Sequence, residues 1–478
     1  MIFSSTVFLF LFLPIVLTGY YCIPGIRLRN LCLLLASLFF YAWGEGIYLI
    51  LMLFSIFFNY GIGLLLAANN SPFRAKLFLT LAITIDLGML GAFKYANFLV
   101  ESLNMLLHQL EIAPLELAPI HLPIGISFFT FQALSYVIDV FRKQTRVQRN
   151  VLDCGLYIAL FPQLIAGPIV RYHDIALQLR NRQHTPVKFH SGIILFIIGL
   201  SKKMLLANPM GSVADQIFAL PVEELSLVLS WSGAIAYTLQ IYFDFSGYSD
   251  MAIGLGRMFG FEFLINFNYP YTARSFREFW QRWHISLSRW FRDYLYIPLG
   301  GNRYSPWRTG INLWIVFLLC GLWHGASWNF VLWGTLHGCF LIGERFLWGT
   351  LLSTLPNILR HMYLLFGVLV TWVFFRADSI QTGLHFIAAM FGGHRISSQI
   401  YPLDLVWNSH SVFVLILACA GATPLFLKGQ QTLFVPGSAS TNTMFWCIMS
   451  FLFFAVLFIL CAMELAAGTH NPFIYFRF

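Results

Sequence analysis

The sequence predicts an all-α polytopic membrane protein, with roughly 11–13 transmembrane helices and additional re-entrant or interfacial helices. Two observations lead to this fold class. Of the 478 residues, 58% are hydrophobic and only 10% are charged, and the mean hydropathy is +0.73. Soluble domains carry about a quarter charged residues, so a soluble fold of this length would leave too much apolar surface uncovered. The second observation is the content of 50 Phe and 14 Trp, because aromatic side chains suit contact with lipid and with membrane interfaces.

Hydrophobic runs of about 20 residues mark the predicted spans. Stretch 1–25 has no basic n-region and no small-residue cleavage site, so we interpret it as containing the first span and not as a removed signal peptide. The run 161–171 contains two prolines and a glycine, which favours a broken or re-entrant segment. The predicted spans lie near 4–21, 30–45, 47–68, 77–96, 122–141, 151–170, 190–207, 226–243, 250–266, 309–326, 328–348, 358–376, 411–427 and 443–464.

Loop charges predict the orientation of the chain. Arginines and lysines gather near 27–29, 74–76 and 142–149, whereas 95–121 and 209–224 contain acidic residues and no Lys or Arg. This alternation is typical of a positive-inside topology, which places the basic loops in the cytosol and the N-terminus on the outer side. The same bias explains the net charge of +9, so no nucleic-acid partner is predicted.

The cysteines and histidines do not form a metal-binding pattern. The eight cysteines are scattered through apolar runs without a CxxC pair, so they are interpreted as small buried hydrophobic side chains. The histidines have neither an HExxH sequence nor a third clustered ligand beside them. The sequence therefore predicts no metal ion and no bound cofactor.

Polar residues at membrane depth are costly and are candidates for function by default. Gln132, Tyr136 and Asp139 recur at i, i+4 and i+7, so they share one helix face that is turned away from lipid. Asp244 and Asp250 flank a short polar run in an apolar setting. They could be buried partners of arginines in the next segment, a proton path, or part of a substrate channel. Structural ion pairing is the plainest of these interpretations.

The stretch 274–292 is predicted to form a strongly amphipathic helix. At about 100° per residue its arginines fall on one side and its aromatic side chains on the other. His284 lies on the seam between the two faces, as in a helix that lies at the membrane surface. The plain interpretation is an interfacial anchor. The functional interpretation is that Arg282, Arg289 and Arg292 bind the phosphate groups of a cytosolic donor.

His324 ends a long apolar run and stands between Trp323 and Gly325. A lone buried histidine is often a structural residue, but an ionisable group inside a membrane is also a candidate for function. Histidine is the side chain best suited to proton transfer near neutral pH. We therefore predict that His324 and His284 line a reaction chamber, whereas His337 is interpreted as structural.

Several long motifs resemble the membrane-bound O-acyltransferase family, and most closely its bacterial alginate O-acetylase branch. They are YFDFSGYSDMAIGLGRMFGF (242–261), NFNYPYTARSFREFWQRWHISLSRWFRDYLYIPLGGNR (266–303) and LCGLWHGASWNFVLWGTLHG (319–338), with weaker support from LPIGISFFTFQALSYVIDV (122–140) and LFPQLIAGPIVRY (160–172). The resemblance implies a single membrane-embedded acyltransferase domain over 1–478, with core motifs in 122–345 and a C-terminal tail at 465–478. It also implies that the helices surround a central funnel.

The resemblance assigns roles as well. The near-invariant histidine of the family corresponds to His324, and its second histidine, in a WHxS context, corresponds to His284. Such proteins move an acyl group from a cytosolic thioester, acetyl-CoA or a donor derived from it, to a hydroxyl presented across the membrane. The implied acceptor is an exopolysaccharide, above all alginate, with peptidoglycan or another envelope polymer as the alternative. Periplasmic acetyltransferase-type partner proteins would complete the transfer at the bacterial inner membrane, and the N-terminus would be periplasmic.

The C-terminal residues NPFIYFRF (471–478) resemble the acyl-relay motif of small partner proteins in teichoic acid D-alanylation. On that resemblance the hydroxyl of Tyr475 carries the acyl group before it reaches the final acceptor. An interfacial anchor is the plain alternative.

Two other classes of protein remain open. A transporter would use Asp139, Asp244, Asp250 and His324 as a proton relay coupled to the export of an envelope precursor. The sequence shows no inverted repeat, and an arginine-rich amphipathic helix is unusual for that class. A scaffold for a synthesis complex is the other alternative. Of the three, only an acyltransferase would consume a thioester.

Overall fold

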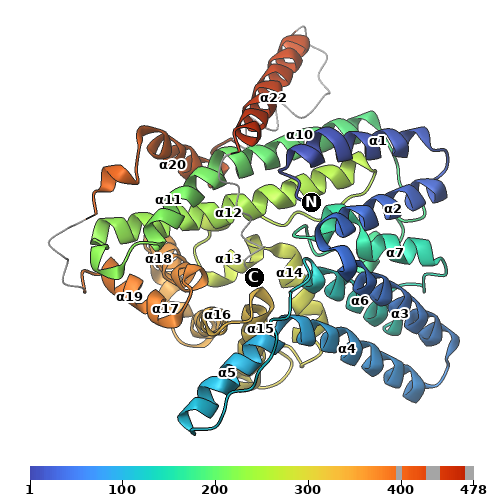
Figure 1. Ribbon diagram of the computed structural model, residues 1–478, viewed down its shortest axis with the longest axis horizontal. Helices are drawn as coiled ribbons and strands as arrows, with labels where there is room; N and C mark the ends of the chain where they lie inside the picture. The colour runs from blue at the N-terminus through green and yellow to red at the C-terminus, as the bar shows by residue number, and fades with distance from the viewer. Residues whose placement is uncertain (394–400, 427–441, 469–478) are drawn as a thin grey trace. The chain divides into compact units, whose positions relative to one another are not determined.

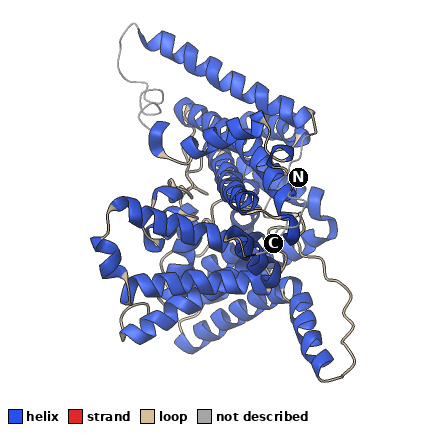
Figure 2. Ribbon diagram, turned by 90° about the vertical axis from the view of Figure 1, so that its left-hand side faces the viewer, coloured by secondary structure: helices blue, strands red, loops and turns tan. Residues whose placement is uncertain are grey.

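Helices make up the regular secondary structure of the computed structural model, which describes residues 1–393, 401–426 and 442–468 (Figures 1 and 2). Within these residues there is no β-strand. The helices group into two compact units, which are described separately. Unit 1 comprises residues 1–189, 255–264 and 325–327, and unit 2 comprises the remainder.

Unit 1 contains the long apolar helices of the first part of the chain. Helix α6 is buried along its length, and Gln132, Tyr136 and Asp139 are all fully buried, as their shared face predicts. Packing against α6 requires a glycine, because a Cβ at Gly63 of α3 would collide with the Tyr136 hydroxyl. The helices are α1 (Leu13–Cys22, after a π-helical turn at Phe8–Phe12), α2 (Ile26–Glu45), α3 (Leu49–Ala68), α4 (Pro72–Lys94), α5 (Ala96–Gln109), α6 (Ile126–Phe141) and α7 (Val151–Ala159).

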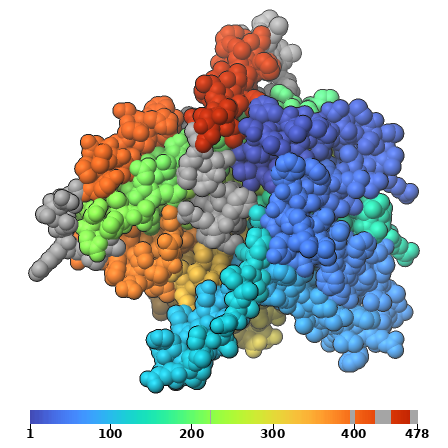
Figure 3. Space-filling view, viewed as in Figure 1, coloured from blue at the N-terminus to red at the C-terminus, as the bar shows by residue number. Residues whose placement is uncertain are grey.

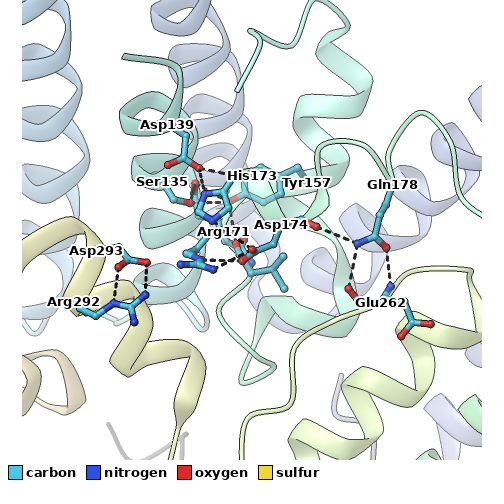
Figure 4. A network of polar contacts seen from close by, with 12 residues as sticks. Ser135, Asp139, Tyr157, Arg171, His173, Asp174, Gln178, Glu262, Arg292 and Asp293 are labelled. Atoms are coloured by element: carbon cyan, nitrogen blue, oxygen red, sulfur yellow. Dashed lines mark hydrogen bonds and ion pairs between the residues drawn. The ribbon is translucent and has the colours of Figure 1, made fainter. Parts of the chain in front are cut away.

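The run 161–171 is broken, as its prolines and glycine predict. A single turn, α8 (Phe161–Leu164), is followed by a stretch without helix and then by the short α9 (Tyr172–Ile175). Polar contacts hold the end of this segment (Figure 4). The Nδ1 of His173 lies 2.8 Å from a carboxylate oxygen of Asp139, and Arg171 forms a bidentate pair with Asp174 at 2.8 and 3.0 Å.

Unit 2 is formed by the later helices. Its tightest helix pair is α15 with α16, where a Cβ at Gly321 or Gly334 would collide with a backbone carbonyl of the other helix. Helix α22 projects from the rest of unit 2 and keeps most of its apolar side chains exposed (Figures 1 and 3). The helices are α10 (Pro186–Ser201), α11 (Asn208–Phe218), α12 (Leu227–Met258), α13 (Phe276–Arg282), α14 (Ile285–Phe291), α15 (Pro306–His324), α16 (Trp328–Phe346), α17 (Gly349–Thr354), α18 (Asn357–Arg376), α19 (Ile380–Met390), α20 (Ser409–Gly421) and α22 (Asn442–Ala466).

The prediction of two spans at 226–243 and 250–266 is wrong, because one helix, α12, runs from Leu227 to Met258. Partners on a neighbouring segment allow the helix to continue through its polar run. Lys203 and Lys202, in a π-helical turn at 202–207, lie 2.7 Å from Asp244 and 2.6 Å from Asp250. Both acids are therefore in ion pairs, and their partners are lysines instead of arginines.

The two acidic stretches predicted as outer loops are helical over much of their length. Helix α5 occupies 96–109, and α11 continues the α10 segment through 208–218. The absence of Lys and Arg from these stretches therefore did not show where the helices end and the loops begin.

Five helical segments in the described part of the chain are long and apolar enough to cross a membrane. Four shorter apolar helices accompany them, at Phe8–Cys22, Ile126–Phe141, Ile380–Met390 and Ser409–Gly421. These helices agree with the predicted all-α membrane fold, and the figure of roughly 11–13 crossings stays a prediction. The five long segments are Ile26–Ala68, Pro72–Lys94, Pro186–Phe218, Asn357–Arg376 and Phe445–Ala466.

Candidate active site

The predicted continuous helix over 274–292 is interrupted at His284. Helix α13 ends at Arg282, Trp283 is extended, and His284 has left-handed backbone angles, φ 43° and ψ 54°. A loop beside the break supplies the missing backbone partners. The amide of Ile285 donates to the carbonyl of Asn266, and the amide of Asn268 donates to the carbonyl of Arg282, both at 2.9 Å. The loop at 266–268 thus fixes a conformation that histidine rarely adopts.

Because of this break, residues 274–292 do not form the single amphipathic helix that was predicted to lie at the membrane surface with its aromatic side chains in lipid. His284 is fully buried, and the aromatic side chains on both sides of it are buried as well. The seam position that the helical wheel gives to His284 is therefore wrong, because the periodicity ends at Trp283. The buried aromatic residues of this segment are Phe276, Phe279, Trp280, Trp283, Trp290 and Phe291.

The hydrogen bonds of Asn266 determine the tautomer of His284. The backbone N–H of Ser286 donates to Asn266 Oδ1 at 3.1 Å, so this atom is the amide oxygen. It also lies 3.1 Å from His284 Nδ1, which must therefore carry a hydrogen and donate it. The amide nitrogen of Asn266 donates to Ser249 at 3.0 Å and holds the loop to α12.

A neutral His284 consequently has its lone pair on Nε2. This atom is buried and has no hydrogen-bond partner among the described residues. Burial lowers the pKa of His284 below its ordinary value, because the protein interior disfavours the imidazolium. The ring lies 4.6 Å from the ring of Phe245 and 6.0 Å from that of Trp323, centroid to centroid. The arrangement presents a proton-accepting nitrogen in an aromatic setting.

His324 is the last residue of α15 and is 5% exposed. Aromatic rings surround it: centroids lie at 4.9 Å for Trp323, 5.2 Å for Trp333 and 5.3 Å for Phe375. Trp323 thus lies against both His324 and His284. The two histidines predicted to share a chamber are therefore in contact with the same indole.

His337 belongs to the same aromatic cluster. The indole N–H of Trp280 donates to His337 Nδ1 at 3.3 Å, so a neutral His337 carries its hydrogen on Nε2. Trp333 contacts both of these histidines, with its ring centroid 4.6 Å from that of His337 and 5.2 Å from that of His324. The Nε1–H of Trp333 is buried and has no acceptor among the described residues. The cluster therefore contains an unused hydrogen-bond donor beside His324.

The three arginines predicted to bind donor phosphate have different surroundings. Arg282 is bound to Glu278, with Nη2 2.8 Å from the carboxylate. Arg289 is half-buried on α14. Arg292 is exposed and paired with Asp293, with Nε 2.7 Å from the carboxylate (Figure 4).

A cavity of about 820 Å³ lies in unit 2 between α13 and helices α14 to α18. Leu313, Val316, Phe317 and Leu341 give it an apolar wall, and Trp280 borders it. Four arginines line it as well: Arg277, Arg292, Arg345 and Arg360. Of the three arginines chosen from the sequence, Arg292 is therefore the one that reaches this cavity.

Two further predictions concern this site. Tyr475 lies outside the described residues. No group of three or more His, Cys, Asp or Glu suited to a metal ion occurs in the part of the chain that the structure describes.

Sequence reasoning missed Asn266 and Trp333. Asn266 precedes His284 by 18 residues, and its role depends on a loop that folds back along a helix break. The run NFNYP contained the signal, since an asparagine and a proline next to an aromatic helix favour a fixed loop. Trp333 lies on α16 within an ordinary apolar pattern, and nothing in the sequence distinguishes it.

Comparison with known proteins identifies relatives over the whole chain. The model of the MBOAT, membrane-bound O-acyltransferase family matches residues 47–386. The probable alginate O-acetylase AlgI of Pseudomonas putida is 43% identical over the full length of both chains. The protein of the same name from Pseudomonas aeruginosa is 46% identical over 90% of this chain and 84% of its own. The peptidoglycan O-acetyltransferase of Helicobacter pylori is 36% identical over 83% of this chain and 81% of its own.

His284, His324 and His337 all lie inside the stretch that the family model matches. The match and the long apolar helices agree, and they confirm a multi-pass membrane protein with acyl-transfer activity. The chain belongs to the membrane-bound O-acyltransferase family and is a polytopic O-acyltransferase.

Proposed function

We propose that this protein moves an acetyl group from a cytosolic thioester, acetyl-CoA or a donor derived from it, to a hydroxyl of an exopolysaccharide, with alginate as the first candidate. The observation that carries the proposal is the likeness, over the full length of both chains, to the probable alginate O-acetylase of Pseudomonas putida. Peptidoglycan is the second candidate acceptor, because a peptidoglycan O-acetyltransferase is also similar over most of its length.

Transfer to a hydroxyl needs a base, a donor for the developing oxyanion, and protection from water. We assign the base to His324. It accepts the hydroxyl proton as the oxygen attacks the thioester carbonyl, the C–S bond breaks, and the proton passes to the leaving thiolate. The products are an ester and a free thiol. The aromatic rings around His324 exclude water from the reacting atoms.

His284 orients the acceptor in this scheme. Its Nε2 carries a lone pair, so it accepts a hydrogen bond from a hydroxyl. Stabilising an oxyanion through Nε2 would require the imidazolium, which burial disfavours. The unused indole N–H of Trp333 is the group that we assign to the oxyanion.

Location and partners complete the proposal. The protein lies in the bacterial inner membrane with a periplasmic N-terminus and cytosolic basic loops. Periplasmic partner proteins of the acetyltransferase type finish the transfer to the polymer. Tyr475 carries the acyl group on the way, and a Tyr475→Phe variant is then expected to be expressed normally but to leave the polymer without acetyl groups. Normal polymer acetylation in that variant would remove Tyr475 from the pathway.

Purified protein with radiolabelled acetyl-CoA tests the reaction class. The labelled acetyl group should leave CoA and appear on the protein, on an added acceptor, or as free acetate after transfer to water. Free CoA should accumulate. A proton-coupled transporter or a scaffold would leave the thioester intact. The acceptor is tested in a deletion strain by measuring ester-linked acetate on alginate and on peptidoglycan separately. Loss from alginate alone supports the first candidate, and loss from peptidoglycan alone supports the second.

A further inference from the structure

We infer that the cavity beside α13 binds the phosphate-bearing part of the acyl donor, through Arg277, Arg345 and Arg360. The inference rests on the proposed function and changes the residues assigned to donor binding. Arg282 is occupied by Glu278, and neither Arg282 nor Arg289 lines the cavity.

The charges around the cavity favour an anion. Four arginines line it, against a single carboxylate, Glu344. That carboxylate is already engaged, since it accepts the backbone N–H groups of Phe276 at 2.6 Å and of Arg277 at 3.1 Å. It caps the start of α13, so its negative charge is partly balanced by the N-terminus of that helix.

Three of the arginines form no close ion pair with a carboxylate of the described residues. Among the described residues no carboxylate lies within 4.0 Å of the guanidinium nitrogens of Arg277, Arg345 or Arg360. The Nε–H of Arg360 is buried and has no hydrogen-bond acceptor in the part of the chain that the structure describes. A buried donor on a cation is costly without an acceptor, and phosphate oxygens provide one in the geometry that guanidinium prefers.

One wall of the cavity runs along α15 in the direction of His324. Its wall follows α15 from Leu313 to Cys320, a rise of about 10 Å. Cys320 lies one helical turn before His324. Trp280 also borders the cavity and donates its indole N–H to His337. A ligand with phosphates at the arginines would therefore direct its thioester-bearing arm toward the aromatic cluster.

Loop charge places this end of unit 2 on the donor's side. Here α15 begins, α16 ends and α18 begins. Between residues 297 and 360 the charged residues other than Glu344 are all basic: Arg303, Arg308, Arg345 and Arg360. Such an excess is typical of cytosolic ends of membrane helices, where a nucleotide-bearing thioester is found.

An anionic phospholipid also presents phosphate above an apolar chain. The route toward His324 favours the donor, because a structural lipid would gain nothing from reaching the histidines. The two ligands predict different results for variants of the arginines. If the arginines bind the donor, turnover of a thioester without phosphate groups should not depend on them. If they bind a lipid that the protein requires, turnover of every thioester should fall equally.

The test compares acetyl-CoA with S-acetylpantetheine, which has the same thioester and no phosphate. Arg345→Gln, Arg360→Gln and the double variant are assayed beside Arg308→Gln, a control at the same end that does not line the cavity. The KM for acetyl-CoA should rise by about ten- to a hundredfold in the cavity variants. Their kcat, their KM for S-acetylpantetheine, and both constants of the control should stay within about twofold.

Unchanged KM for acetyl-CoA in the double variant would overturn the inference. Equal loss with both thioesters, reversed by adding anionic phospholipid vesicles, would also overturn it and assign the cavity to lipid. Calorimetric titration with CoA separates this inference from the proposed function. If wild type binds CoA, the double variant does not, and no thioester is consumed, the cavity assignment stands while the proposed reaction fails.

Discussion

His284 donates its Nδ1 hydrogen to the side-chain oxygen of Asn266 across 3.1 Å, and this single contact leaves Nε2 as the basic atom of a buried imidazole. The same oxygen accepts from the backbone and side chain of Ser286 at 3.1 and 2.9 Å, so its position is fixed. Asn266 is therefore a positioning residue. It acts through His284 and is 18 residues distant in the chain.

Replacing Asn266 with Asp should shift the pH dependence of the reaction. A carboxylate at Nδ1 favours the imidazolium and raises the pKa of His284. The neutral form is then lost at a higher pH as the solution is made more acidic, so the acidic limb of kcat/KM should move to higher pH. The profile of kcat/KM against pH measures this shift. The conservative Asn266→Gln variant should keep the wild-type midpoint at reduced kcat. An identical acidic limb in wild type and Asn266→Asp would show that the contact with Asn266 does not control the protonation of His284.

Trp333→Phe tests the proposed oxyanion donor. The change keeps an aromatic ring against His324 and His337 but removes the indole N–H. If that N–H stabilises the oxyanion, kcat should fall by about a hundredfold or more, with KM little changed. Steady-state kinetics with radiolabelled acetyl-CoA measures both constants. Trp372→Phe, a change of the neighbouring indole that stacks on Trp333, is the matched control for packing. An equal fall in both variants would attribute the effect to packing and not to the N–H.

The Lys203–Asp244 pair is expected to stabilise the fold without taking part in the reaction. The side chains are 2% and 1% exposed, so Lys203→Met would leave an uncompensated buried carboxylate and destabilise the protein by about 3–5 kcal/mol. The double change to Met and Leu should restore most of the thermal stability. The exposed Arg292–Asp293 pair is the control, because its removal should cost less than about 1 kcal/mol.

Turnover by the Lys203 and Asp244 double variant tests whether the pair takes part in the reaction. An acyltransferase with its base at His324 should retain thioester consumption. Loss of thioester consumption in a folded double variant would instead show that the pair takes part in the reaction.

His173 should make unit 1 less stable at higher pH. Its hydrogen bond to Asp139 raises the pKa of His173 above the ordinary value. Because the folded pKa is the higher one, this stabilisation is complete below the unfolded pKa of about 6.5 and is lost as pH rises through the folded pKa. The thermal midpoint of wild type should therefore fall between pH of about 6 and about 8 by more than that of His173→Gln. Parallel curves for the two proteins would contradict this assignment.

Hydropathy located most of the described helices, but it did not reveal which segments lie against one another. The spans at 47–68, 309–326 and 358–376 agree with α3, α15 and α18 within a few residues. The polar run from Asp244 to Asp250 looked like a break between two spans, because the sequence pattern did not show which basic residues pair with its acids. Their lysines come from a segment some forty residues earlier, so α12 continues.

The candidate site shows the same division. Residue chemistry selected His284 and His324, and the structure brings both against Trp323. Periodicity assigned His284 to a helix seam, whereas the loop at 266–268 fixes it at a break. The arginines were chosen by their position on one helix. The cavity instead collects arginines from three helices, α13, α16 and α18, which no single-helix pattern can show.

Steady-state thioester turnover by a His324→Ala variant of the purified protein tests the central claim most directly. If His324 is the base, kcat should fall by at least about a hundredfold. The thermal midpoint of the His324→Ala variant and its KM for acetyl-CoA should stay near those of wild type. The control is His410→Ala, which changes an exposed histidine and should leave the thermal midpoint, kcat and KM near those of wild type. A folded His324→Ala protein whose turnover lies within about tenfold of wild type would contradict the account.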